Sequence, residues 1–218
     1  WRHSEHGWVA PGKFIPIIEK LGLSTTFAAW VIDESCRQVV RWRKANTGAA
    51  RVAVNLTASQ LRSPLLIDQT RSALLRHGIQ PGEFEFEIEE DAILDDPEDI
   101  IDQMKALDAL GVELAIANFG RMLSSLTYLR RLPVRTLKLS REIVAAIDRQ
   151  DIGNSNIIVD TALTMAHDIG LRVVAEGVET EAQQNYLTQR QCDLLQGYLV
   201  SKPLTEAEVV TFMNGGGI

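Results

Sequence analysis

The chain has 218 residues, of which 45% are hydrophobic and 23% are charged, so it can bury a sizeable core without disulfides or a structural metal. Its net charge of −7 argues against a protein that follows nucleic-acid phosphates through massed Lys and Arg side chains, and no apolar run approaches the roughly 18 residues of a membrane span. The two cysteines, Cys36 and Cys192, lack zinc-binding spacing, so we expect a reducing, cytoplasmic setting.

The first predicted elements are two helices at the start of what we expect to be a piece of a longer protein. The chain opens on Trp1 rather than Met, and all four Trp residues fall in its first fifth. Pro11 leads a helix over 12–22 that has apolar residues at helical spacing. Ser24 or Thr25 is expected to cap an amphipathic helix that runs to residue 46.

Strands and helices then alternate to the end of the chain. The predicted strands occupy residues 51–56, 84–90, 112–118, 134–140, 171–176 and 192–199. The predicted helices occupy 65–78, 97–111, 124–131, 141–147, 154–170, 181–191 and 206–214. This alternation is typical of a parallel sheet covered by helices.

Two architectures fit these strands. Six strands are enough for an open doubly wound sheet, but no Gly-rich phosphate-binding loop follows any of them. A closed (β/α)₈ barrel needs eight strands and typically about 250 residues, so the chain would lack two strands of a barrel.

Polar side chains gather at the predicted strand ends, where barrels of this class carry their chemistry. Alternation places the three glutamates of the strand over 84–90 on one face, and three carboxylates inside a barrel are costly unless they are paired or bound to metal. Each polar residue alone is typical of a solvated or ion-paired side chain, but convergence of several strand ends indicates a site. The residues expected to converge are Asn55, Glu87, Glu89, Lys138 and Glu176.

Several stretches of the chain then become recognisable together. They read FIPIIEKLGL, VAVNLTASQL, EFEIEEDAIL, SSLTYLRRLPV, LKLSREIV, VVAEGVETEAQQNYL and CDLLQGYLVSKPL. With these motifs the chain resembles the EAL family of bacterial cyclic-di-GMP phosphodiesterases from residue 1 to about residue 205. The resemblance implies an α/β fold, a TIM-like (β/α)₈ barrel of the EAL type whose first two strands are not in this chain. Residues 1–218 would form this domain as the C-terminal module of a larger signalling protein.

The resemblance also implies a site that binds cyclic-di-GMP. In active members two Mg²⁺ or Mn²⁺ ions activate a water molecule that opens one phosphodiester. Asn55 and Glu87 match metal ligands of the family, and Asn118 stands at a metal-ligand position. Lys138 matches the catalytic lysine, and Glu176 matches a glutamate near the metals that is the proposed base.

Other matched positions concern the ligand and the loops around it. Glu179 matches a glutamate that helps to hold the loop after its strand. Gln196 and Tyr198 match the segment that borders the nucleotide pocket. Arg121 has no counterpart in the family pattern, and as a basic residue of the loop on the pocket side it could contact a phosphate in place of a metal ion, unless it is simply solvated.

The chain departs from the family pattern at several carboxylates. Ala117 stands where active members have an Asp that touches both metals, and Asn118 replaces the next Asp. Ser140 replaces the Asp after the catalytic lysine, and Glu89 replaces a Thr. The Glu and Arg of the signature motif would lie before Trp1. Since two-metal sites need anionic oxygens that bridge the ions, we expect phosphodiesterase activity to be absent or negligible.

Three hypotheses about function follow. The preferred one is a degenerate EAL domain that binds cyclic-di-GMP without hydrolysing it, with no metal bound. The second is an active, metal-dependent phosphodiesterase. The third is a ligand-free scaffold that binds a protein partner, for which Met122 and Leu123 would suit a docking surface. In a degenerate site we expect Lys138 to pair with Glu87 or Glu89.

The resemblance also suggests partners. A GGDEF-like or sensor domain upstream is common in the family, and members pair as homodimers through barrel helices. The basic residues Arg130, Arg131 and Arg135 are interpreted as a solvated helix end rather than as a nucleic-acid patch.

Overall fold

The strands form one curled parallel sheet. The computed structural model describes residues 1–5, 7–45, 51–94, 97–120, 129–148 and 155–215. The main strands are β3 (Val52–Leu56), β4 (Phe84–Glu89), β5 (Glu113–Phe119), β6 (Thr136–Leu139), β7 (Arg172–Glu176) and β8 (Leu194–Gln196). They pair in chain order from β3 to β8, and all five pairings are parallel. This order confirms the six predicted strands and fits part of a TIM-like barrel, since a doubly wound sheet reverses its strand order.

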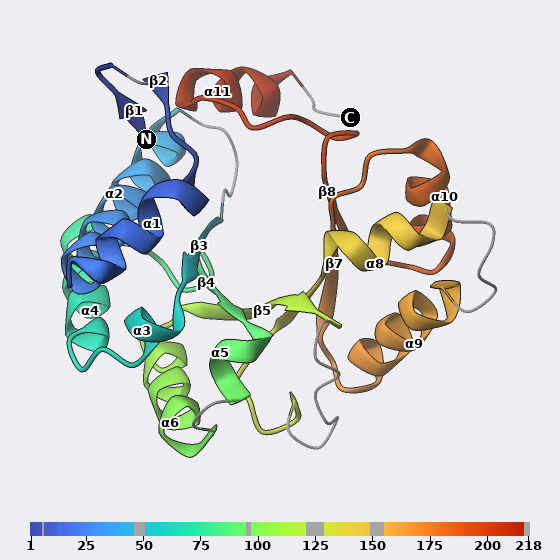
Figure 1. The fold of residues 1–218 in the computed structure, drawn as a ribbon, viewed down its shortest axis with the longest axis horizontal. Coiled ribbons are helices and arrows are strands. Elements are labelled where there is room, and N and C mark those ends of the chain that lie inside the picture. Colours follow the sequence, from blue (N-terminus) through green and yellow to red (C-terminus); the bar gives the residue numbers. More distant parts are fainter. Residues whose placement is uncertain (6, 46–50, 95–96, 121–128, 149–154, 216–218) are drawn as a thin grey trace.

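Helices cover the outside of this sheet, as Figure 1 shows. The described helices are α1 (Pro11–Lys20), α2 (Ser24–Lys44), α3 (Ala58–Leu61), α4 (Leu66–His77), α5 (Glu90–Leu94), α6 (Pro97–Asp108), α8 (Arg141–Ala145), the 3₁₀ helix η1 (Ala146–Asp148), α9 (Ser155–Asp168), α10 (Glu181–Gln189) and α11 (Glu206–Asn214). In Figure 1, α11 lies at the open side of the curl, between β8 and the N-terminal helices, and does not cover the outside. Most of the helix predicted over 124–131 lies outside the described residues.

Local details at the helix ends both support and correct the sequence-based expectations. Gly78 ends α4 in the left-handed conformation with φ of 61°, as its position predicts. The predicted cap of α2 is wrong, because Ser24 is already helical, Leu23 precedes it and no side chain caps this end. The chain also begins with a short antiparallel hairpin, β1 (Arg2–His3) and β2 (Gly7–Trp8), that was not predicted.

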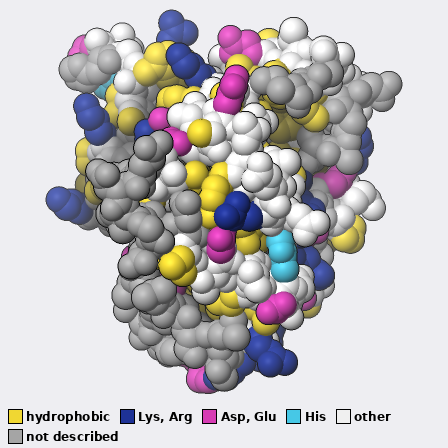
Figure 2. All heavy atoms as spheres, turned by 90° about the vertical axis from the view of Figure 1, so that its right-hand side faces the viewer, with side chains coloured by type: hydrophobic (Ala, Val, Ile, Leu, Met, Phe, Trp, Pro, Cys, Tyr) yellow, Lys and Arg dark blue, Asp and Glu magenta, His cyan; other side chains and the backbone are white. Residues whose placement is uncertain are grey.

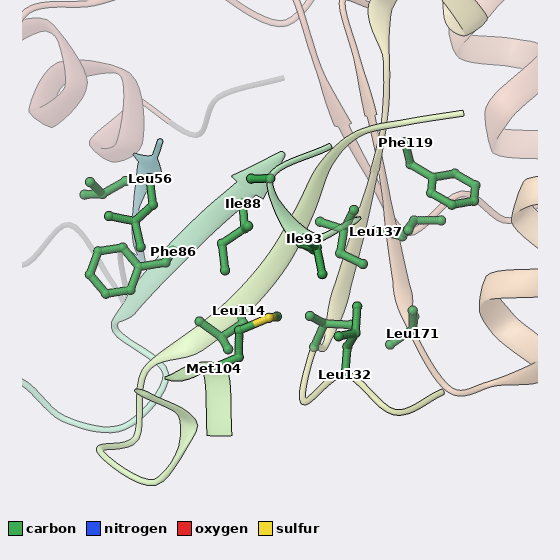
Figure 3. Packing of buried hydrophobic residues seen from close by; sticks show 14 of the residues in the cluster. Leu56, Phe86, Ile88, Ile93, Met104, Leu114, Phe119, Leu132, Leu137 and Leu171 are labelled. Atoms are coloured by element: carbon green, nitrogen blue, oxygen red, sulfur yellow. The ribbon is translucent and has the colours of Figure 1, made fainter. Parts of the chain in front are cut away.

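The core lies between the outer face of the sheet and the helices. Phe84, Phe86 and Ile88 of β4 are fully or almost fully buried, as alternation along this strand predicts. Figure 3 shows Phe86 and Ile88 gathered in this core with Leu114 of β5 and Met104 of α6. Each such side chain contributes about 1.5–3 kcal/mol when it leaves water, so the outer face of the sheet provides much of the stability.

An ion-pair cluster joins α2 to α4. The Asp33 carboxylate of α2 lies 2.6 Å from Arg76 and 2.9 Å from the His77 ring nitrogen, both on α4. The hydrogen bond from His77 is the main cause that lowers the pKa of Asp33, and burial only partly offsets it. The cluster therefore stabilises the packing of these two helices while Asp33 is ionised.

On the face that Figure 2 shows, the described basic side chains are scattered among acidic and apolar ones. Arg131 lies 2.7 Å from Glu98 and Arg135 lies 3.1 Å from Asp108, and both arginine side chains are exposed, as their interpretation as solvated residues predicts. Within the described ranges, no helix is long and apolar enough to span a bilayer.

Candidate functional site

The inner face of the curled sheet is polar, because strand register brings the alternate residues of neighbouring strands onto the same side. Glu87 of β4 pairs in register with Asn55 of β3 and Ala115 of β5. Glu176 of β7 pairs in register with Gln196 of β8. The side chains that the sequence predicted to converge therefore share this inner face.

At the end of the inner face where the strands begin (the lower end), acidic and basic side chains form ion pairs. The Glu113 carboxylate lies 2.5 Å from both Arg51 and Arg172, and Arg51 lies 3.1 Å from Glu85. The Thr136 hydroxyl donates to Glu85 over 3.4 Å. Burial raises the pKa of Glu85, and Arg51 partly offsets this effect. Two arginines neutralise two glutamates here, so this end is a structural ion-pair network.

At the opposite end of the inner face, towards the carboxyl ends of the strands (the upper end), Lys138 is the central residue. Its Nζ lies 2.6 Å from Glu87 Oε1 and 2.6 Å from Glu176 Oε1. Lys138 is 3% exposed, and burial alone would lower its pKa, but the two carboxylates outweigh burial and raise the pKa above its ordinary value. The predicted pairing of Lys138 with Glu87 is confirmed, while the partnership with Glu176 was not predicted as a contact.

A β-bulge lies beside this lysine. The ladder between β5 and β6 shifts register after Ile116, so that Ala117 and Asn118 together lie opposite Lys138. Asn118 has a φ of 55°, a left-handed conformation that Asn tolerates better than most residues. Its side-chain amide donates to Glu89 Oε1 over 3.3 Å. Glu89 therefore pairs with Asn118 and not with Lys138.

A hollow opens beside the upper rim. It has a volume of about 710 Å³ and lies between α1 and the ends of β3 and β4. Asn55, Thr57 and Glu89 supply polar atoms to its wall, and Pro11 and Ile15 supply an apolar side. A mixed wall of this kind suits a ligand with both flat and polar parts.

The residues predicted to border the ligand lie along the opposite edge of the sheet. Gln196 is exposed at the end of β8, and Tyr198 is 60% exposed just beyond it. Glu179 is exposed in the loop after β7 and lies 2.7 Å from Arg141. Arg121, like Met122 and Leu123, lies outside the described residues.

Two residues near the site, Arg141 and Glu90, were not predicted from the sequence. Arg141 reaches over Gly177, whose left-handed φ of 71° and lack of a side chain let the arginine pack against it. Glu90 is buried and accepts a hydrogen bond from the Gly120 backbone N–H over 3.3 Å, which ties α5 to the end of β5. These contacts join loops, so strand alternation could not reveal them, although glycines directly after two strands were an available signal.

The donor set does not fit two divalent ions. The Ala117 side chain offers no oxygen, Asn118 offers only a neutral amide oxygen while its amide nitrogen donates to Glu89, and Glu87 is already paired with Lys138. In the part of the chain that the structure describes, no three His, Cys, Asp or Glu side chains lie where one metal ion could bind them together. The buried Ser140 hydroxyl, with no hydrogen-bond partner in that same part, is neutral as well. A two-metal centre requires bridging carboxylates, which these residues do not provide.

Comparison with known proteins places this geometry in a family. The model of the EAL domain matches residues 1–203. The bifunctional diguanylate cyclase/cyclic di-GMP phosphodiesterase MucR of Pseudomonas aeruginosa is 38% identical over 212 residues, which cover 96% of the chain and 30% of MucR. The cyclic di-GMP phosphodiesterase NbdA of the same organism is 38% identical over 98% of the chain and 27% of its own length. The chain thus spans less than a third of either relative.

A solved structure agrees with these matches. The PaMucR phosphodiesterase in complex with c-di-GMP superimposes with a TM-score of 0.90 at 37% identity, covering 96% of this chain and 84% of that one.

Proposed function

The chain belongs to the EAL domain family, and from that premise we propose that it binds cyclic-di-GMP without hydrolysing it. Support for binding comes from the similarity in both sequence and fold to a phosphodiesterase whose structure was solved with this ligand. The hollow beside Asn55 and Glu89, with its mixed polar and apolar wall, and the exposed Gln196 and Tyr198 on the facing edge would provide surfaces for the bases and sugars.

The single observation that carries the absence of hydrolysis is the alanine at position 117. It lies on the inner face at the end of β5, in register with Glu89 and 4% exposed. The resemblance implies that active members use a carboxylate at this position to hold both metals, and a two-metal site needs such a bridge to activate water. Asn118 is neutral, and its amide nitrogen donates to Glu89, so it does not replace the missing negative charge.

A fluorescence titration with labelled cyclic-di-GMP tests the proposal. We expect saturable binding in EDTA that Mn²⁺ leaves unchanged, with no linear dinucleotide formed. Turnover in Mn²⁺ would instead identify an active phosphodiesterase, and an absence of binding in both buffers would favour the protein-binding scaffold.

A pair of glutamine variants makes the binding test specific. Gln196→Ala removes a polar side chain at the site, and we expect it to weaken binding about tenfold, the equivalent of one lost hydrogen bond of about 1.4 kcal/mol. Gln189→Ala, at the exposed end of α10, is the matched control and should bind as the unmodified protein does. Equal affinities for the two variants would place the ligand elsewhere.

The wider organisation of the protein is also a proposal. In the described sheet, β3 and β8 are the edge strands, and exposed edge strands pair readily with further strands. We infer that two more strands complete the barrel. We propose that the domain is one module of a larger signalling protein with a GGDEF-like or sensor partner domain. The cytoplasmic location and the homodimer stay predictions.

A further inference from the structure

Lys138 occupies the centre of the upper site. It comes from β6, and its ammonium reaches Glu87 on β4 and Glu176 on the adjacent β7, each over 2.6 Å. Both contacts have the short length of charge-assisted hydrogen bonds, and the lysine is almost completely buried. One cation therefore joins carboxylates from two strands that do not neighbour each other.

The space for this contact is made by β5. This strand lies between β4 and β6, and its inner-face residues next to Glu87 and Glu89 are Ala115 and Ala117. Both end at a methyl group, so the Glu87 carboxylate can reach across β5 to the ammonium of Lys138. A longer side chain at position 117 would enter the same space, because the bulge places this residue opposite Lys138.

A divalent ion would compete with the ammonium for the same oxygens. Glu87 and Glu176 each direct Oε1 to Lys138, and a metal ion that took these oxygens would lie next to an ammonium of like charge. Because Ala117 supplies no carboxylate to offset this charge, such juxtaposition inside a poorly solvated site disfavours metal binding.

We propose that the Lys138 ammonium is the resident cation of this site: it holds Glu87 and Glu176 in the place of a divalent metal ion, and Ala117 leaves the room that it needs. This inference rests on one part of the proposed function, namely that the site carries out no two-metal chemistry. It assigns Lys138 a positioning role instead of a catalytic one.

Binding of Mn²⁺ alone tests the inference, without any nucleotide. Measured by electron paramagnetic resonance of free Mn²⁺, the unmodified protein should bind the ion at least about tenfold more weakly than Lys138→Met, in which two carboxylates are left without a cation. The matched control is the double variant Lys138→Met/Glu87→Gln, which should lose the gained affinity. Equal Mn²⁺ affinity of the unmodified protein and Lys138→Met would overturn the inference.

A second measurement on the unmodified protein covers the case in which Lys138→Met does not fold. Its thermal midpoint should be the same in EDTA and in Mn²⁺, since ligands that bind only the folded state raise the midpoint. A Mn²⁺-dependent rise that Glu87→Gln abolishes would contradict the inference. Failure of cyclic-di-GMP binding, in contrast, would refute the proposed function and leave these metal results standing.

Discussion

The substitution Ala117→Asp would return to β5 the carboxylate that active family members have, and it should destabilise this protein. Position 117 is 4% exposed and in register with Glu89, and adjacent strands lie about 4.8 Å apart. Two carboxylates about 5 Å apart repel by about 3 kcal/mol at an effective dielectric constant of about 20. Lys138 offsets little of this, because two other glutamates already hold its ammonium. We therefore expect a loss of about 2–3 kcal/mol in the free energy of unfolding at pH 7.

Urea unfolding followed by circular dichroism in EDTA measures this loss, with Ala117→Asn as a control of nearly equal volume and no charge. Repulsion raises the folded-state pKa of the introduced carboxyl, so the loss should be complete above that pKa and should disappear as the pH falls towards the unfolded value of about 3.9. Equal stabilities of the two variants at pH 7, or a difference that does not depend on pH, would show that repulsion between the two carboxylates does not cause the loss.

Three further predictions concern the helices and the core. Phe86→Ala should lower the free energy of unfolding by about 3–5 kcal/mol in urea, because Phe86 is completely buried, and a loss below about 1 kcal/mol would contradict its place in the core. Asp33→Asn should cost about 1–2 kcal/mol at pH 7. Since His77 holds the folded-state pKa of Asp33 below 3.8, this difference should persist above pH 3.8 and close as the pH falls through the lower folded-state pKa in pH-resolved unfolding. Cys36, whose pKa burial raises to about 12, should resist iodoacetamide at pH 8 until urea unfolds the protein; rapid alkylation of the native state would count against this burial.

Much of the fold followed from periodicity in the sequence. The alternation of residue types along β4 predicted that Phe86 packs under the helices and that Glu87 lies on the opposite, inner face, because successive side chains of a strand point to opposite sides. The N-terminal hairpin escaped prediction, since its strands have two residues each and carry no alternating pattern. The cap of α2 was misplaced because Ser24 and Thr25 suit both a cap and a first helical turn.

The candidate site was predictable in composition but not in its pairings. Parity placed Lys138 and Glu87 on one face, and their ion pair follows from it. The contact with Glu176 depends on how strongly the sheet curls, which no local pattern specifies. The bond between Asn118 and Glu89 depends on a bulge that changes register by one residue, and such a shift is set by tertiary packing.

Equilibrium dialysis with radiolabelled cyclic-di-GMP, followed by chromatography of the retained fraction, tests directly whether this EAL domain binds the ligand and whether it leaves the ligand intact. We expect the protein to retain the ligand in EDTA and in Mn²⁺, and the retained ligand to be the uncut cyclic dinucleotide in both. Linear dinucleotide in the Mn²⁺ sample, or no retained ligand in either buffer, would contradict this expectation.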